Sequence, residues 1–251
     1  MKRSVLLILF FVSMAAEAES FCIAHQGVFK EAPKNSLASL QNALDLDADG
    51  VEFDIQHTKD GIPLVNHDSV LTYASSLPGK SCPTKTKISE LTAHEIRENC
   101  TLSYQDQFHV IPTLDEALDS VASSGKFVFI ELKDDPQEET KSIIKKHFSH
   151  DASKLRIIAF KIRHLDLLID VQDPFWANVK ALDLDVGPWG TPSRYGVNVW
   201  NRLINWNLRK NLINRETSVW TVNKEKRMKM FLEKKVTFIT TDEVQMCLNL
   251  K

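Results

Sequence analysis

Acidic and imidazole side chains gather in V-E-F-D-I-Q-H-T-K-D-G-I-P-L-V-N-H-D, residues 51–68. Glu52 and Asp54 lie two positions apart in an apolar run, so both carboxylates point to the same side of an extended strand. A second apolar run ends at His67 and Asp68, which places an imidazole beside an acid. Two acids on one face of an apolar strand are costly to bury unpaired, so the stretch predicts a metal-assisted site rather than salt bridges at a rim.

Polar side chains also recur at the ends of other apolar runs. They are His25, Glu131 with Lys133, Trp220 with Asn223, and Asp242. In a barrel of parallel strands all strand ends of one polarity meet at a single mouth, where these side chains would form one site.

Apolar runs alternate with amphipathic segments along most of the chain, which indicates a parallel sheet covered by helices. Eight strand starts are expected, at Phe21, Val51, Pro63, Phe127, Arg156, Ala181, Thr217 and Thr237. Eight such units predict an α/β fold of the (β/α)8 TIM-barrel type, with a doubly wound sheet as the alternative. Tyr195–Val199 is a further short strand or completes the layer before it.

Helices are expected between these strands. Their ranges are 37–46, Leu114–Ser123, Glu138–Phe148, His164–Val171, Arg202–Leu212 and Lys224–Lys234. Asn35 or Ser36 can cap the first helix, and Thr113 with Glu116 forms a capping box for the second. Residues 69–110 are too long for a simple connection, so they predict an inserted loop region after the third strand, with a short helix starting at Ser89–Glu95.

The turn at Lys59–Gly61 conflicts with a purely parallel arrangement. Its Asp-Gly pair is typical of a tight hairpin, whereas neighbouring parallel strands need a long crossover. We resolve the conflict in favour of the barrel, with a tight reversal that returns to a short barrel strand.

The chain begins with a targeting segment. Lys2-Arg3, an apolar run and Ala16-Glu17-Ala18 form a signal-peptide pattern, which predicts cleavage after Ala18 and one domain over residues 19–251. The exported protein would be periplasmic or secreted, without a further membrane segment. The net charge of −2 indicates no nucleic-acid or other polyanion partner.

All four cysteines lie in the exported part, where disulfides are permitted. Cys82 and Cys100 bracket a polar segment that they can close. Cys22 and Cys247 lie near the two ends of the mature chain, which a closed barrel would bring together. Four cysteines allow three pairings, and the sequence does not choose among them.

Motifs spread over the mature chain resemble the glycerophosphodiester phosphodiesterase family, of the PLC-like phosphodiesterase type. They are I-A-H-Q-G at 23–27, A-P-K-N-S at 32–36, V-E-F-D-I-Q-H-T-K-D-G at 51–61, V-N-H-D at 65–68, I-P-T-L-D-E-A-L at 111–118, I-E-L-K at 130–133, V-W-T-V-N at 219–223 and F-I-T-T-D at 238–242. The resemblance implies a TIM barrel, a divalent metal, and hydrolysis of a glycerophosphodiester to sn-glycerol 3-phosphate and an alcohol.

The resemblance assigns roles to the candidate residues. The expected metal ligands are Glu52, Asp54 and Glu131, an all-oxygen set that favours Ca²⁺ or Mg²⁺ over zinc. His25 and His67 are the expected acid and base, in an order that the sequence leaves open.

Six further residues complete the expected site. Gln26, Lys133 and Trp220 are expected to contact the substrate or its phosphate, and Asp68, Asn35 and Asn223 to support the site. The remaining histidines that we considered, His57, His94, His109, His147 and His164, are interpreted as surface residues.

The chain departs from the family pattern at three places. Gln26 stands where the family has arginine, which removes a bidentate phosphate ligand. Lys34 replaces a glutamate close by, and Val236-Thr237-Phe238 stands where Val-Asp-Gly is favoured.

Two alternatives follow from these departures. One is an enzyme with the same chemistry acting on a lysophospholipid or another phosphodiester. The other is a barrel that binds a phospholipid head group without hydrolysing it. The oligomeric state is left open by the sequence.

Overall fold

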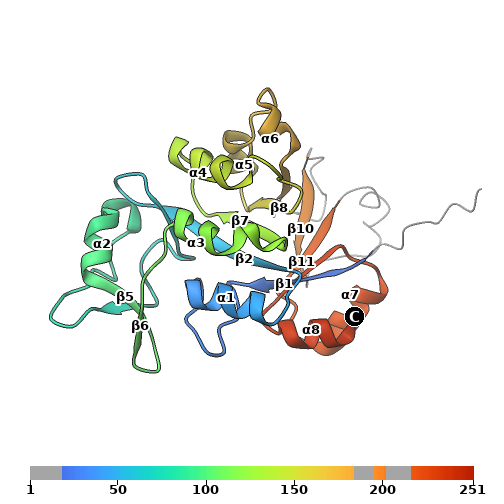
Figure 1. The fold of residues 1–251 in the computed structure, drawn as a ribbon, viewed down its shortest axis with the longest axis horizontal. Helices are drawn as coiled ribbons and strands as arrows, with labels where there is room; N and C mark the ends of the chain where they lie inside the picture. Colours follow the sequence, from blue (N-terminus) through green and yellow to red (C-terminus); the bar gives the residue numbers. More distant parts are fainter. Residues whose placement is uncertain (1–18, 184–194, 202–215) are drawn as a thin grey trace, which may run out of the picture.

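A computed structural model describes residues 19–183, 195–201 and 216–251. Within them, eight parallel strands close into a barrel, because the first strand pairs with both the second and the last (Figure 1). These strands are β1 (Phe21–His25), β2 (Gly50–His57), β7 (Phe127–Leu132), β8 (Leu155–Ala159), β9 (Lys180–Asp183), β10 (Gly196–Trp200), β11 (Thr217–Trp220) and β12 (Phe238–Thr241). The predicted TIM barrel is therefore confirmed.

The barrel strands are apolar because both of their faces are buried. Every residue of β2 and of β7 is buried. One face of the strands fills the barrel interior with Ile23, Phe127, Phe129, Ile158, Leu182 and Phe238. The other face packs against the surrounding helices in a larger cluster. Strands covered on both sides appear as continuous apolar runs, which is why they were recognisable in the sequence.

One predicted barrel strand is wrong. β3 (Pro63–Val65) pairs with β2 in antiparallel orientation, with Val65 opposite Ile55, so the two strands form a hairpin. The turn places Gly61 at φ 82°, a conformation that favours glycine. A turn this short cannot provide the crossover that parallel strands require. The eighth barrel strand is instead β10, which overlaps the possible short strand Tyr195–Val199.

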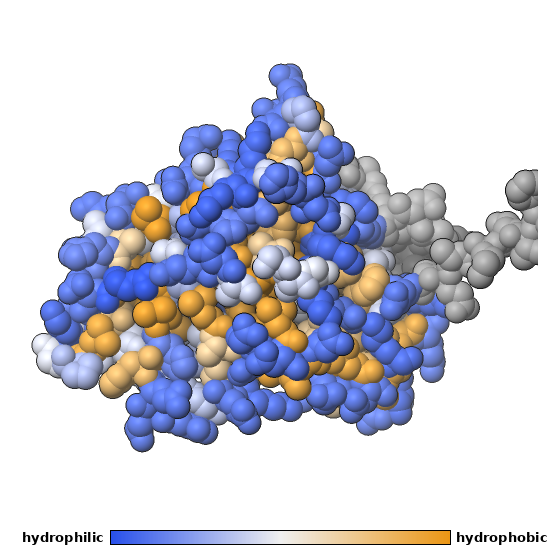
Figure 2. All heavy atoms as spheres, in the orientation of Figure 1, coloured by the Kyte–Doolittle hydropathy of each residue, from blue (hydrophilic) through white to orange (hydrophobic). Residues whose placement is uncertain are grey.

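Helices cover the outside of the barrel, and Figure 2 shows mainly hydrophilic side chains over the face seen in Figure 1. The expected helices correspond to α1 (Leu37–Asp45), α3 (Leu114–Val121), α4 (Glu138–Phe148), α5 (Ile162–Leu168) and α7 (Glu225–Glu233). Ser36 caps α1, and the predicted Thr113–Glu116 capping box begins α3. The short helices α6 (Pro174–Asn178) and α8 (Val244–Leu250) were not predicted.

The predicted insertion forms a small subdomain at one end of the barrel, at the left in Figure 1. It contains the antiparallel strands β4 (Ala74–Ser76), β5 (Cys100–Tyr104) and β6 (Gln107–His109), which the sequence interpretation took as loop. The expected short helix is divided into the 3-10 turn η1 (Ile88–Glu90) and α2 (Ala93–Asn99), which begins at the Thr92 cap. A separate apolar cluster around Leu71, Ile88 and Ile96 stabilises the subdomain.

Both considered disulfide pairings are confirmed. Cys82 and Cys100 close the insertion, and Cys22 and Cys247 link β1 to α8. The predicted signal peptide at 1–18 and the predicted helix Arg202–Leu212 lie outside the described residues. Across the described ranges, none of the helices combines the length and the hydrophobicity that a membrane crossing requires.

Candidate active site

Three carboxylates meet at the carboxyl end of the barrel. Glu52 and Asp54 point inward from β2, and Glu131 points inward from β7, where it is paired in register with Asp54. Oxygens of all three side chains lie within 4.8 Å of one another. The residues are 1%, 1% and 8% exposed, so this acidic trio is removed from bulk water.

The trio perturbs its own ionisation. Burial, followed by repulsion from Asp54 and Glu131, raises the pKa of Glu52 well above its ordinary value. Burial and the charge of Asp54 raise the pKa of Glu131 to about 7. Burial also acts to raise the pKa of Asp54, but the charges of Lys133 and His67 and a hydrogen bond from Asn35 outweigh it, so this pKa is lowered.

Two residues with left-handed backbone conformations orient the trio. Gln26 (φ 57°) donates from its backbone N–H to Glu52 Oε2 at 3.0 Å and from its side-chain amide to Asp54 Oδ2 at 2.7 Å. Asn35 (φ 57°) donates to the same Asp54 oxygen at 2.9 Å. The Gln26 side-chain amide, which we expect to contact phosphate, thus donates to a carboxylate of the trio. Asn35, expected to support the site, donates to the same carboxylate.

Lys133 places its ammonium among these carboxylates. Nζ lies 2.5 Å from Glu131 Oε1 and 3.0 Å from Asp54 Oδ1. Burial lowers the pKa of Lys133, but the charges of Asp54 and Glu131 act more strongly in the opposite direction and raise it overall. The lysine is therefore a fixed positive charge at the trio.

His25 lies beside the trio and is held by an acid from the other end of the chain. Its Nδ1 is 2.8 Å from Asp242 Oδ1, and Asn223 donates to Asp242 Oδ2 at 2.6 Å. Burial acts to raise the pKa of Asp242, but the hydrogen bond and charge of His25 lower it, helped by Asn223. Asp242 was noticed only as a strand-end acid, and its position directly after the last strand was the signal for a role in the site.

His67 forms a second and more exposed imidazole–acid pair. Its Nδ1 is 2.7 Å from Asp68 Oδ1, and its side chain is 45% exposed. Gln56 fixes the backbone by donating to the His67 carbonyl at 2.8 Å. Hydrogen bonds from Thr72 and His67 lower the pKa of Asp68.

Trp220 lies on the inward face of β11, where it packs against the interior cluster of the barrel. Its ring meets that of Phe160 edge-on, with centroids 5.5 Å apart. The indole Nε1 is buried and has no hydrogen-bond partner among the described residues. Phe160 also lies under the Lys133 ammonium, with Nζ 5.6 Å from its ring centroid. The aromatic pair therefore adjoins the charged groups at the mouth.

Two of the five histidines interpreted as surface residues are buried instead, and a third, His147, is partly buried. His57 and His164 are 3% and 4% exposed, and the side chain of His147 is 9% exposed. Each lies close to an aspartate, at 2.6 Å for His57, 2.7 Å for His147 and 3.4 Å for His164. His94 is exposed as expected, and His109 is half-buried. An imidazole with acidic neighbours is buried at lower cost than its isolated polarity indicates.

The trio fits a hard divalent cation. Its donors are all carboxylate oxygens, and Glu52 Oε1 is buried without a hydrogen-bond partner in the described part of the chain. Two of the three carboxyl groups have raised pKa values because like charges are crowded away from water. A bound cation would relieve that repulsion. Beside the trio, the mouth offers two imidazoles, each of which contacts an acid.

The model of the glycerophosphoryl diester phosphodiesterase family matches residues 25–172. Human glycerophosphodiester phosphodiesterase 1 is 32% identical over 128 residues, which cover 49% of this chain and 37% of the human protein. The chain spans less than half the length of the first curated relatives that it matches.

Solved structures resemble the fold over nearly the whole chain. A glycerophosphodiester phosphodiesterase from Agrobacterium tumefaciens has a TM-score of 0.74 and 16% identity, covering 92% of this chain and 99% of that one. An Oleispira antarctica phosphodiesterase, solved in complex with the product sn-glycerol-3-phosphate, has a TM-score of 0.72 and 21% identity, covering 92% and 96%. Because the family model covers more than half of the sequence, the chain belongs to the glycerophosphoryl diester phosphodiesterase family.

Proposed function

We propose that this protein is a metal-dependent phosphodiesterase that hydrolyses glycerophosphodiesters to sn-glycerol 3-phosphate and an alcohol. Membership of the family supports the reaction class. The observation that carries the proposal is the buried acidic trio of Glu52, Asp54 and Glu131, with an imidazole–acid pair at the same end of the barrel. A phosphodiester anion repels nucleophiles, so its hydrolysis needs this combination of positive charge and proton transfer.

The trio is the proposed holder of one Ca²⁺ or Mg²⁺ ion. When bound, the cation supplies positive charge that neutralises the phosphate oxygens. The ordered hydrogen bonds from Gln26 and Asn35 to Asp54 keep the carboxylate oxygens oriented for that ligand. Lys133 contributes a second positive charge, which we assign to the phosphate, and Trp220 is the proposed apolar wall for the glycerol or the alcohol.

His25 and His67 are the proposed proton-transfer groups. One accepts the proton of the attacking hydroxyl, and the other donates a proton to the leaving alcohol oxygen as its bond to phosphorus breaks. Attack by water gives glycerol 3-phosphate directly, whereas attack by a hydroxyl of the substrate glycerol gives a cyclic phosphate that water then opens. Asp242 and Asp68 accept from Nδ1 of these rings, so Nε2 of each ring is the nitrogen left for the substrate.

The test is an assay of glycerol 3-phosphate release from glycerophosphocholine in Ca²⁺, in Mg²⁺ and in EDTA. We expect activity with a divalent cation, none in EDTA, and loss of activity in His25→Ala and Glu52→Gln. His94→Ala, an exposed histidine on α2, is the matched control and keeps full activity. Retained activity in either site variant would contradict the site assignment.

A substrate panel separates the neighbouring alternatives. Faster hydrolysis of lysophospholipids than of glycerophosphodiesters would make a lysophospholipid the substrate, with the same hydrolytic chemistry. Cation binding in calorimetry without turnover of any diester would show a binding barrel. Gln26 motivates the comparison, because its neutral amide replaces an arginine and is already engaged by Asp54.

Export is proposed on two grounds. The N-terminal pattern at residues 1–18 is that of a signal peptide, and the two disulfides fit an oxidising compartment. The expected mature protein is a single domain beginning at Glu19. N-terminal sequencing of protein collected outside the cytoplasm tests this, and an uncleaved Met1 would contradict it.

A further inference from the structure

His57, at the end of β2, is a buried imidazole with a partner on each nitrogen. Nδ1 lies 2.6 Å from Asp134 Oδ1, and Nε2 lies 2.6 Å from the hydroxyl oxygen of Thr140 in α4. A carboxylate only accepts hydrogen bonds, so Nδ1 carries a proton, and the Thr140 hydroxyl is the partner of Nε2. The three residues join β2, the segment after β7, and α4.

The side chain of Asp134 extends the hydrogen bonding between β2 and β7 beyond the last pair of backbone partners. The strand register ends at Ile55 and Leu132, and the N–H of Lys133 donates to the Ile55 carbonyl at 3.2 Å. At the following position the carboxylate takes the place of a backbone carbonyl, because Asp134 Oδ2 accepts from the N–H of His57 at 3.0 Å. His57 therefore binds both oxygens of Asp134. The backbone at Lys133 is thus attached to β2 twice, through its own N–H to Ile55 and through the next residue, Asp134, to His57.

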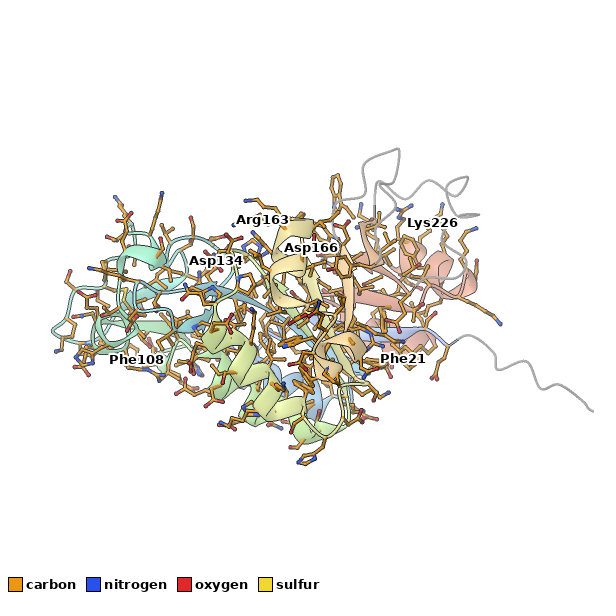
Figure 3. All side chains as sticks on the ribbon, turned by 90° about the horizontal axis from the view of Figure 1, so that it is seen from above. Phe21, Phe108, Asp134, Arg163, Asp166 and Lys226 are labelled. Carbon is orange, nitrogen blue, oxygen red and sulfur yellow. A yellow bond between two sulfur atoms is a disulfide. The ribbon has the colours of Figure 1, made fainter. Side chains whose placement is uncertain are left out.

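The position of this attachment at the mouth is visible in Figure 3. Asp134 lies towards the insertion and near Arg163, whereas Phe21 lies at the opposite end of the barrel. His164 of α5 approaches the same segment from the other side, with Nδ1 3.4 Å from the Leu132 carbonyl. Arg163 forms an ion pair with Asp135.

Lys133 depends on this support more than a shorter side chain would. Its flexible stem has many rotamers, and that freedom must be lost when the ammonium is held in one place. The ammonium is held 2.5 Å from Glu131 and 3.0 Å from Asp54. A backbone anchored on both sides limits the positions that the side chain can reach.

We propose that His57, Asp134 and Thr140 are positioning residues that fix the backbone at Lys133 and so aim its ammonium at the acidic trio and the substrate phosphate. The phosphate part rests on the proposed function, whereas the geometry at the trio does not. Releasing Lys133 has two effects of opposite sign. The diester loses a positive contact and binds more weakly, but a cation at the trio loses a competitor and binds more tightly.

These opposite signs distinguish positioning from general damage to the fold. In His57→Leu we expect the KM for glycerophosphocholine to rise about tenfold with a smaller change in kcat, and the Kd for Ca²⁺ to fall about threefold. Thr140→Val is a milder version with the same directions, and Thr140→Ser, which keeps the hydroxyl, restores wild-type values. A variant that only loosened the barrel would weaken the binding of both the diester and Ca²⁺.

The matched control is His147→Leu. His147 is a partly buried imidazole bonded to an aspartate, with Nε2 2.7 Å from Asp115 Oδ1, but it lies in the outer helical layer between α3 and α4. Its loss is expected to lower the melting temperature while leaving the KM for glycerophosphocholine unchanged.

The decisive measurement is a double-mutant cycle with Lys133→Met, read by calorimetric titration of Ca²⁺ in the full chain. Lys133→Met alone is expected to tighten Ca²⁺ binding, and adding His57→Leu to it is expected to change nothing further. Additive effects, or weaker Ca²⁺ binding in His57→Leu, would overturn the proposal. The titration needs no turnover, so a protein inactive on every diester would refute the proposed function and still test the positioning role.

Discussion

His25 Nδ1 lies 2.8 Å from Asp242 Oδ1, and this contact joins the end of the first barrel strand to the residue that follows the last one. It exists only because the barrel is closed, since 217 positions separate the two residues. The carboxylate is itself fixed by the Asn223 amide. Asp242 therefore sets which nitrogen of His25 carries a proton.

Asp242→Asn is expected to lower kcat by about 10²-fold or more, the contribution typical of a proton-transfer group. The amide group can donate to Nδ1 and stabilise the wrong tautomer, as in the histidine of a serine-protease triad. Steady-state kinetics measures the effect. Asp68→Asn is the comparison, because the His67–Asp68 pair is exposed and its loss costs less. Equal kcat values for Asp242→Asn and the wild type would exclude this role.

Glu52→Gln is expected to raise the melting temperature of the cation-free protein. The substitution removes a buried carboxyl group whose pKa is raised by burial and by two neighbouring acids. It should also abolish stabilisation by Ca²⁺ or Mg²⁺, which at 100 times Kd is about 2.7 kcal/mol. Thermal unfolding with and without the cation measures both effects. Glu139→Gln, at an exposed position on α4, should change neither.

The cation-free protein is expected to lose stability as the pH rises from 4.5 to about 7. The pKa of Glu131 is raised from 4.5 to about 7, so in this range the folded state binds a proton that the unfolded state releases. More protons bound by the folded state means that the free energy of unfolding falls with pH, here by a total on the order of 3 kcal/mol. Chemical denaturation of the wild type and of Glu131→Gln isolates this contribution, which the substitution should remove. If the free energy of unfolding varied with pH in the same way in both proteins, the raised pKa of the Glu131 carboxyl would be wrong.

The two disulfides are expected to contribute unequally to stability. Cys22 and Cys247 are 225 positions apart, whereas Cys82 and Cys100 are 18 apart. In the chain-entropy model the longer loop stabilises by about 2 kcal/mol more. Urea unfolding of the two double serine variants compares them, with the variant at Cys22 and Cys247 expected to unfold first. The reverse order would mean that strain or residual structure in the unfolded chain dominates.

The hairpin of β2 and β3 shows where reasoning from the sequence went wrong. The Asp60-Gly61 turn indicated an antiparallel reversal, which is what forms, but Pro63–Val65 was counted as a barrel strand to reach eight. The strand that completes the barrel, β10, has Asn198 at its centre and so lacks an uninterrupted apolar run. Hydrophobic pattern identifies a strand but does not name its neighbour.

The burial of His57 differs from the prediction for a related reason. His57 lies next to Thr58 and Lys59 in the sequence, a polar setting that resembles surface. Its actual partners, Asp134 and Thr140, are 77 and 83 positions away. Burial of a polar side chain depends on such distant partners, and the neighbouring sequence does not indicate which they are.

The sequence by itself determined the apolar strands, the family, and which residues carry acids, imidazoles and amides near the strand ends. Strand alternation places Glu52 and Asp54 on one face whatever surrounds them. Tertiary structure decided what those groups touch: Lys133 between two carboxylates, the Gln26 amide on Asp54, and Asp242 on His25. Desolvation and Coulomb energy depend on distance and burial in space, so the electrostatics of the site exist only once the barrel has closed.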